Sequence, residues 1–162
     1  MADREHYRTL LYPLLRAEYD CAGRLNRLLG AETRALVARD VETIERLIED
    51  KQSLLQEFEA LETRMQQLLR DAGFGGERPD IEACLTWCDE QGGLIRGWQL
   101  VLERVRQAQR QNRVNGVTLE AARRHAQQAV SVLRGEVPQM EVYNPAGSTA
   151  SNVAGSRTIA KA

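Results

Sequence analysis

Aromatic residues are scarce in this chain: two tryptophans, four tyrosines and two phenylalanines make up only 5% of its 162 residues. Glycine and proline are also sparse until the C-terminal stretch, whereas Leu, Ala, Arg, Glu and Gln dominate. So few aromatic anchors and helix breakers argue against a sheet-rich globule with a thick core. The composition is typical of long helices around a thin core, and we therefore expect an all-α fold.

An excess of charge of either sign is also missing, because the formal net charge is −1. No general electrostatic attraction to nucleic acid or to an anionic membrane surface is therefore expected. No apolar run approaches the roughly 20 residues needed to span a bilayer. The first residues, MADREHYRTLLYPLL, lack the pattern of a secretory signal. We expect a cytoplasmic protein that binds no nucleic acid and inserts into no membrane.

Cysteine is limited to Cys21, Cys84 and Cys88, an odd number that argues against a disulfide framework. Cys84 and Cys88 share one face of a helix, but the isolated histidines, His6 and His125, do not complete a zinc site. We expect both cysteines to be small packing residues, with no metal and no cofactor. The sequence also lacks a nucleophile elbow, a P-loop and a dinucleotide fingerprint, which predicts that the protein is not an enzyme.

The strongest positive signal is a stripe at helical spacing. Steps of three and four residues join eight positions, seven of them apolar: Ile44, Leu47, Lys51, Leu54, Phe58, Leu61, Met65 and Leu68. Such a stripe is the seam of a coiled coil or of a long helical hairpin. Lys51 either fixes register or partner choice, or packs its stem while its ammonium reaches water, and we favour the second interpretation.

Four helices are predicted, over about residues 9–37, 41–72, 81–115 and 118–133. Glu18 and Glu32 interrupt the apolar positions of the first helix, and Asp40 can cap the second. Turn residues 73–79 end the second helix.

Two glycine-containing dipeptides shape the remaining pattern. Asn115-Gly116 is expected to end the third helix, and Thr118 to cap the fourth. Gly92-Gly93 indicates either a break inside the third helix or a close approach to a neighbouring backbone. We favour a local kink.

These patterns predict an elongated antiparallel helical hairpin or coiled-coil bundle of about four helices, followed by a flexible C-terminal tail. The seam of the second helix is expected to pack against the first and third helices, with Trp87 and Trp98 as core anchors. Residues 1–133 would form the bundle. Residues 134–162 lack a helical period, and cannot bury enough apolar area to offset an ordering entropy of about 1–2 kcal/mol per residue. Val142-Tyr143 in this tail either folds back onto the helices or binds a partner.

The order of motifs between Gly97 and Gly147 resembles the flagellar export chaperones of the FlgN family. A tryptophan opens a helix that ends in N-x-x-N-G, and a helix rich in glutamine and alanine follows and closes on Val-Leu. A proline-containing link then leads to a tyrosine with a glycine four residues later. The chain length, the Leu36 to Asp40 joint and the stretch from Lys51 to Leu55 match the family more loosely.

The resemblance implies a cytosolic chaperone of flagellar type III export. Such a chaperone binds the C-terminal helices of hook–filament junction (hook-associated) proteins, prevents their premature assembly and delivers them to the membrane export gate. A tail tyrosine of the family contacts the cytosolic domain of the gate, and Tyr143 stands at that position, although Asn144-Pro145-Ala146 departs from the family's pattern after it. Cargo binding is implied toward the C-terminal helix and tail, where we expect these apolar contacts: Leu119, Val130, Leu133, Met140 and Val142.

One alternative from a different class remains open. The seam can instead belong to a structural coiled-coil homodimer or adaptor protein that has no cargo-release function. The sequence does not decide whether the free protein associates with itself.

Overall fold

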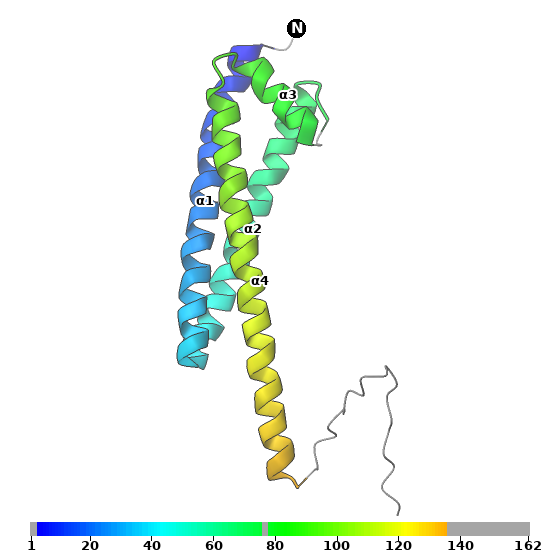
Figure 1. The fold of residues 1–162 in the computed structure, drawn as a ribbon. Coiled ribbons are helices and arrows are strands. Elements are labelled where there is room, and N and C mark those ends of the chain that lie inside the picture. The colour runs from blue at the N-terminus through cyan, green and yellow to red at the C-terminus, as the bar shows by residue number, and fades with distance from the viewer. Residues whose placement is uncertain (1–2, 76–77, 136–162) are drawn as a thin grey trace, which may run out of the picture. The chain divides into compact units, whose positions relative to one another are not determined.

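The computed structural model describes residues 3–75 and 78–135 of the chain (Figure 1). Within these ranges the protein has four helices and no strand, which confirms the all-α prediction: α1 Arg4–Ala38, α2 Val41–Asp71, α3 Arg78–Cys88 and α4 Gly93–Leu133. Residues 1–121 form one compact unit, and the last turns of α4 belong to a second. Almost all of the predicted tail, 134–162, lies outside the described residues.

The turn between α1 and α2 follows from two local signals. Arg39 adopts a left-handed conformation, with φ of 57°, and its N–H donates to carbonyls in the last turn of α1. The Asp40 carboxylate then accepts the Thr43 N–H at 3.1 Å and the Thr43 hydroxyl at 2.7 Å. The predicted Asp40 cap is confirmed, and only two residues, Arg39 and Asp40, separate α1 from α2.

The first helix begins earlier than the sequence pattern predicted. It starts at Arg4 rather than near Thr9, because the Asp3 carboxylate accepts the Glu5 N–H at 3.1 Å and so caps the first turn. Pro13 therefore lies inside α1.

The glycine pair after α3 separates two helices, so the favoured local kink is wrong. The chain leaves the helix after Cys88 and turns at Gly92, whose φ is +75°. The Asp89 carboxylate accepts the backbone N–H groups of Gln91 at 3.2 Å and Leu94 at 3.1 Å, and it thereby caps the start of α4.

The predicted helix end at Asn115-Gly116 is also wrong, because α4 continues through it to Leu133. The Asn115 side chain is buried and donates to the Leu29 carbonyl at 2.9 Å and to the Glu32 carboxylate at 2.8 Å. These bonds to α1 offset the roughly 1 kcal/mol that Gly116 costs a helix interior. Thr118 does not cap a helix, since its hydroxyl donates to the Val114 carbonyl within α4.

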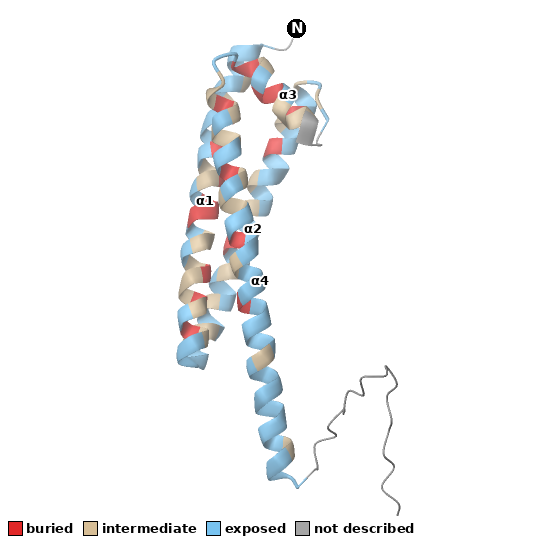
Figure 2. Ribbon diagram, viewed as in Figure 1, coloured by how far each residue is buried: buried red, intermediate tan, exposed pale blue. Residues whose placement is uncertain are grey.

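The apolar core lies in the first unit (Figure 2). Trp87 and Trp98 are half-buried against it, as core anchors, and Cys84 and Cys88 are packing residues within it, as predicted. No helix in residues 3–75 or 78–135 combines the length and apolar character needed to cross a bilayer. The buried members of the core are Leu11, Leu14, Leu15, Met65, Leu69, Cys84, Leu85, Cys88, Leu94 and Val101.

Candidate functional site

A single stripe of side chains runs along α4. It combines two series with seven-residue spacing, offset by three or four residues, which places both series on one side of a helix. One series is Leu94, Val101, Ala108, Asn115, Ala122 and Ala129, and the other is Trp98, Val105, Asn112, Leu119, Ala126 and Leu133.

The burial of this stripe changes abruptly after Asn115 (Figure 2). Asn115 itself is 3% exposed, whereas Leu119 is 45% and Leu133 is 86% exposed. From Gly116 to Gly135, none of the described residues is buried. The stripe is therefore a core seam in its first half and an exposed apolar surface in its second half. This second half and the adjoining Val130, four residues after Ala126, form what we call the α4 end stripe: Leu119, Ala122, Ala126, Ala129, Val130 and Leu133.

Three of the residues predicted to contact cargo lie on the α4 end stripe. Leu119, Val130 and Leu133 are all exposed and on one side of the same helix. Met140, Val142 and Tyr143 lie outside the described residues, so their roles stay predictions.

Three other valines of α4 are exposed by more than half, and they were not among the residues predicted to contact cargo: Val114, Val117 and Val132. Their spacing places Val117 on the side opposite the α4 end stripe and Val114 and Val132 on one flank of it, where a helix that meets only water would carry polar residues.

A polar cluster marks the place where the buried part of the stripe ends. The Lys51 ammonium donates to the buried Glu32 carboxylate at 2.6 Å, and the other Glu32 oxygen accepts from Asn115. The Thr33 hydroxyl donates to the Asn115 amide oxygen at 2.7 Å, and Gln111 donates to Thr33 at 2.9 Å. The favoured interpretation of Lys51, an ammonium directed to water, is therefore wrong.

This cluster draws on three helices, α1, α2 and α4. Buried polar groups with matched partners specify one alignment of helices, because any slip leaves a donor or a charge unpaired. The cluster therefore fixes the register of these helices just before the α4 end stripe begins.

A second polar contact holds α4 against α1 nearer its start. The Arg104 guanidinium lies 3.6 Å from the centre of the Tyr19 ring and donates to the Tyr19 hydroxyl at 2.7 Å. Gly23 makes room for it, because a Cβ at this position would overlap the Arg104 side chain. The Arg104 carbonyl in turn accepts the Asn26 amide at 3.0 Å.

A cleft of about 400 Å³ opens between α1, α2 and α4. Its walls are mostly aliphatic, with Phe58 among them, and four polar residues lie along it: Lys51, Glu62, Gln109 and Asn112. This cleft was not among the features predicted from the sequence. The available signal was the seam on α2, of which only Leu54 and Met65 are fully buried.

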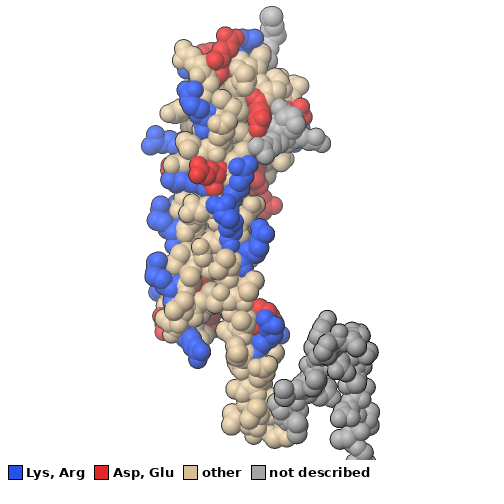
Figure 3. All heavy atoms as spheres, in the orientation of Figure 1, with Lys and Arg blue, Asp and Glu red and all other residues tan. Residues whose placement is uncertain are grey.

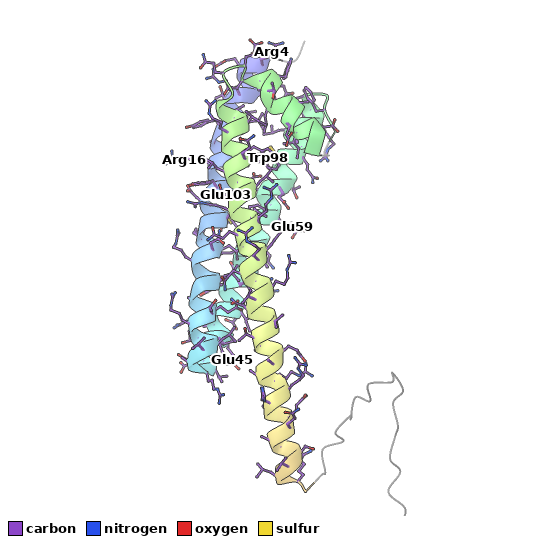
Figure 4. The ribbon with its side chains drawn as sticks, viewed as in Figure 1. Arg4, Arg16, Glu45, Glu59, Trp98 and Glu103 are labelled. Carbon is purple, nitrogen blue, oxygen red and sulfur yellow. The ribbon has the colours of Figure 1, made fainter. Side chains whose placement is uncertain are left out.

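Glu18 is an ionisable group in an apolar setting, only 1% exposed. Burial, and then the nearby charge of Glu62, raise the pKa of the Glu18 carboxyl to about 7. Within the described residues, Glu18 Oε2 and Trp98 Nε1 are buried without a hydrogen-bond partner. Trp98 lies on the upper part of α4 in Figure 4.

Charged side chains do not form a field of one sign on the face shown in Figure 3, where basic and acidic groups are interspersed. Arg16, Glu45 and Glu59 are exposed on their helices (Figure 4). Among the described residues there is no group of three or more His, Cys, Asp or Glu placed to hold a metal ion. The arrangement is suited to recognising an apolar helix face, because its distinctive features are a stripe and a cleft lined by aliphatic side chains.

A comparison with protein families gives a match that covers most of the chain. The family model described as FlgN protein matches residues 8–151. No curated protein and no solved structure matches the chain.

Proposed function

Because the chain belongs to the FlgN family, a family of flagellar export chaperones and not of enzymes, we propose that it is a cytoplasmic chaperone for hook–filament junction (hook-associated) proteins. It binds their C-terminal helices, prevents their premature assembly and delivers them to the export gate. The α4 end stripe holds the cargo helix, and Tyr143 in the tail contacts the cytosolic domain of the gate.

The observation that carries this proposal is the continuation of one heptad stripe from the core into solvent. An amphipathic helix needs an apolar groove or stripe with matching spacing, and the α4 end stripe offers one. Its alanines allow a partner helix to approach closely, while Leu119, Val130 and Leu133 provide larger contacts. Met140 and Val142 extend this contact from the tail.

The expected affinity is moderate. Burying three aliphatic side chains contributes roughly 1.5–3 kcal/mol each, which is of the same order as the roughly 4–15 kcal/mol that association costs. Ordering the tail on the cargo adds a further entropic cost. A complex balanced in this way can form in the cytoplasm and still release its cargo at the gate.

The proposal predicts that Leu133→Asp weakens cargo binding by about tenfold or more, because it places a charge inside the apolar contact. Leu133 is 86% exposed, so folding should be unaffected. The measurement is calorimetric titration of the full chain with a hook-associated protein from the same genome. Val37→Asp, on α1, is the control, since Val37 is also highly exposed, at 78%. An unchanged affinity for Leu133→Asp would refute the assignment of the stripe.

The same titrations separate the two partners. Tyr143→Ala should leave cargo affinity unchanged and weaken binding of the cytosolic domain of the gate. Loss of cargo binding with intact gate binding would overturn the role given to Tyr143. A tight homodimer whose mass in solution does not respond to cargo would instead favour the structural coiled-coil alternative.

A further inference from the structure

The cleft between α1, α2 and α4 has the length and direction of a helix-binding groove. On α2 its lining residues are Lys51, Leu55, Phe58 and Glu62, which follow one another at steps of three and four. This spacing covers about three helical turns, or roughly 16 Å along the helix axis. The groove therefore runs parallel to α2 and not into the core.

The walls of the cleft are incompletely covered by the chain itself. Leu55 is 50% exposed, and Leu25, Phe58 and Val105 are only half-buried although all four are large apolar side chains. Phe58 lies on the α2 seam and Val105 on the α4 stripe, and a neighbouring helix would normally cover such positions. The described chain thus leaves space beside α2 and α4 for one more helix.

The two ends of the cleft differ in charge. At one end Lys51 is neutralised by its ion pair with Glu32. At the other end Glu62 forms no ion pair with any described residue, and it lies close enough to Glu18 to raise the pKa of that buried carboxyl. A positive group near Glu62 would stabilise both carboxylates, so this end of the cleft favours a cation.

We propose that the cleft binds an amphipathic helix of about three turns from the cargo protein, with a lysine or arginine of that helix facing Glu62. The proposal rests on the proposed function and adds a second contact, on α1 and α2, to the α4 end stripe. The apolar walls accept the apolar face of the helix, and the acidic end sets its direction.

The test uses two variants with equal exposure in the free protein. Leu55 and Leu100 are both 50% exposed, but only Leu55 lines the cleft. In titrations with the full-length hook-associated protein, Leu55→Asp should weaken binding by about tenfold, whereas Leu100→Asp should leave the affinity unchanged. Circular dichroism of both variants verifies that their helix content is retained.

Two further measurements address the occupant directly. Hydrogen exchange of the wild-type chain should slow in α2 between Lys51 and Glu62 when cargo is added, because a docked helix shields that surface. Glu62→Gln should weaken binding about threefold and reduce the salt dependence of the dissociation constant.

The outcomes separate this inference from the proposed function. If the wild-type chain does not bind the cargo, both are overturned. If Leu133→Asp weakens cargo binding while Leu55→Asp and the exchange of α2 do not respond, the cleft proposal fails and the chaperone function stands. If Leu55→Asp alters the mass of the free protein in solution but not cargo affinity, the occupant is a second copy of the chain, and the proposal is again overturned.

Discussion

The buried carboxyl of Glu18 should make the protein less stable as the pH rises. In the folded chain, burial and the charge of Glu62 raise the pKa of Glu18 from 4.5 to about 7. An acid whose pKa is raised by folding contributes stability that is complete below its unfolded pKa and is lost as the pH rises through the folded value. The loss therefore begins near pH 4.5 and is complete just above pH 7.

The difference between the two pKa values corresponds to about 3 kcal/mol of unfolding free energy, of which about 2.5 kcal/mol falls between roughly pH 5 and pH 8. This is a large share of the roughly 5–15 kcal/mol that stabilises a typical domain. Because Glu18 is only 1% exposed, solvent screens this effect little.

The variant that tests this reasoning is Glu18→Gln, which keeps the shape of the side chain and cannot ionise. Its unfolding free energy should be nearly constant over the range in which that of the wild type falls. Urea unfolding followed by circular dichroism at several pH values measures both. The informative quantity is the slope of the unfolding free energy against pH. The absolute stability of the variant is less informative, because the buried amide N–H groups replace Glu18 Oε2, which has no hydrogen-bond partner among the described residues, and they can cost stability at every pH.

Other ionisable groups with shifted pKa values lie outside this range. Burial raises the pKa values of the three cysteines, and hydrogen bonds lower those of Asp40 and Asp89. Glu62→Gln is the matched control, because it removes the smaller of the two causes that raise the pKa of Glu18. The variant should therefore keep part of the pH dependence of the wild type. If Glu18→Gln retains the full wild-type slope, the carboxyl ionises normally and the reasoning is wrong.

Two further predictions concern the contacts that hold α4. Gly23→Ala should destabilise the protein by about 1 kcal/mol, because the new Cβ displaces Arg104. In an Arg104→Ala background the same substitution should stabilise the protein by about 1 kcal/mol through helix propensity. Thermal unfolding of this double-mutant cycle measures both effects, and equal effects would contradict the close-approach argument. Asn115→Ala should cost about 2–3 kcal/mol in urea unfolding, because Glu32 loses a donor in a buried site, and a cost below about 0.5 kcal/mol would rule out a structural role for the polar cluster.

Features of the fold that depend on neighbouring residues could be predicted from the sequence. The seam on α2 repeats at a helical period, so its helix was predictable over nearly its whole length. Asp40 caps α2 by accepting the N–H of Thr43, three residues away, so this contact too is local. Cys84 and Cys88 share a helix face without further metal ligands, which pointed correctly to packing.

The errors arose where distant contacts outweigh local preference. Asn115-Gly116 is a typical helix end, yet hydrogen bonds from Asn115 to α1 keep the helix continuous. Gly92 was compatible with a kink in one helix or with a turn between two helices. The chain turns there, because Asp89 caps the start of a new helix. The cleft could not be predicted, because its existence depends on how far α4 lies from α2 at Phe58 and Val105.

For the candidate site, the sequence identified the helix and the exposed residues Leu119, Val130 and Leu133 but not their relation to the core. The seven-residue spacing was present in the printed sequence. The spacing alone does not show that the repeat is buried up to Asn115 and exposed beyond it, because burial depends on where α1 and α2 lie.

The alanines of the α4 end stripe bear on selectivity. Ala122, Ala126 and Ala129 leave shallow sockets that accept leucine, isoleucine or methionine from a partner with little difference in fit. To exclude some partner helices, a binding surface needs bulky or polar residues at such positions, and these three positions are all alanine. If the α4 end stripe holds the cargo helix, as we propose, the chaperone would discriminate weakly among apolar helices, and one chain could serve more than one export substrate.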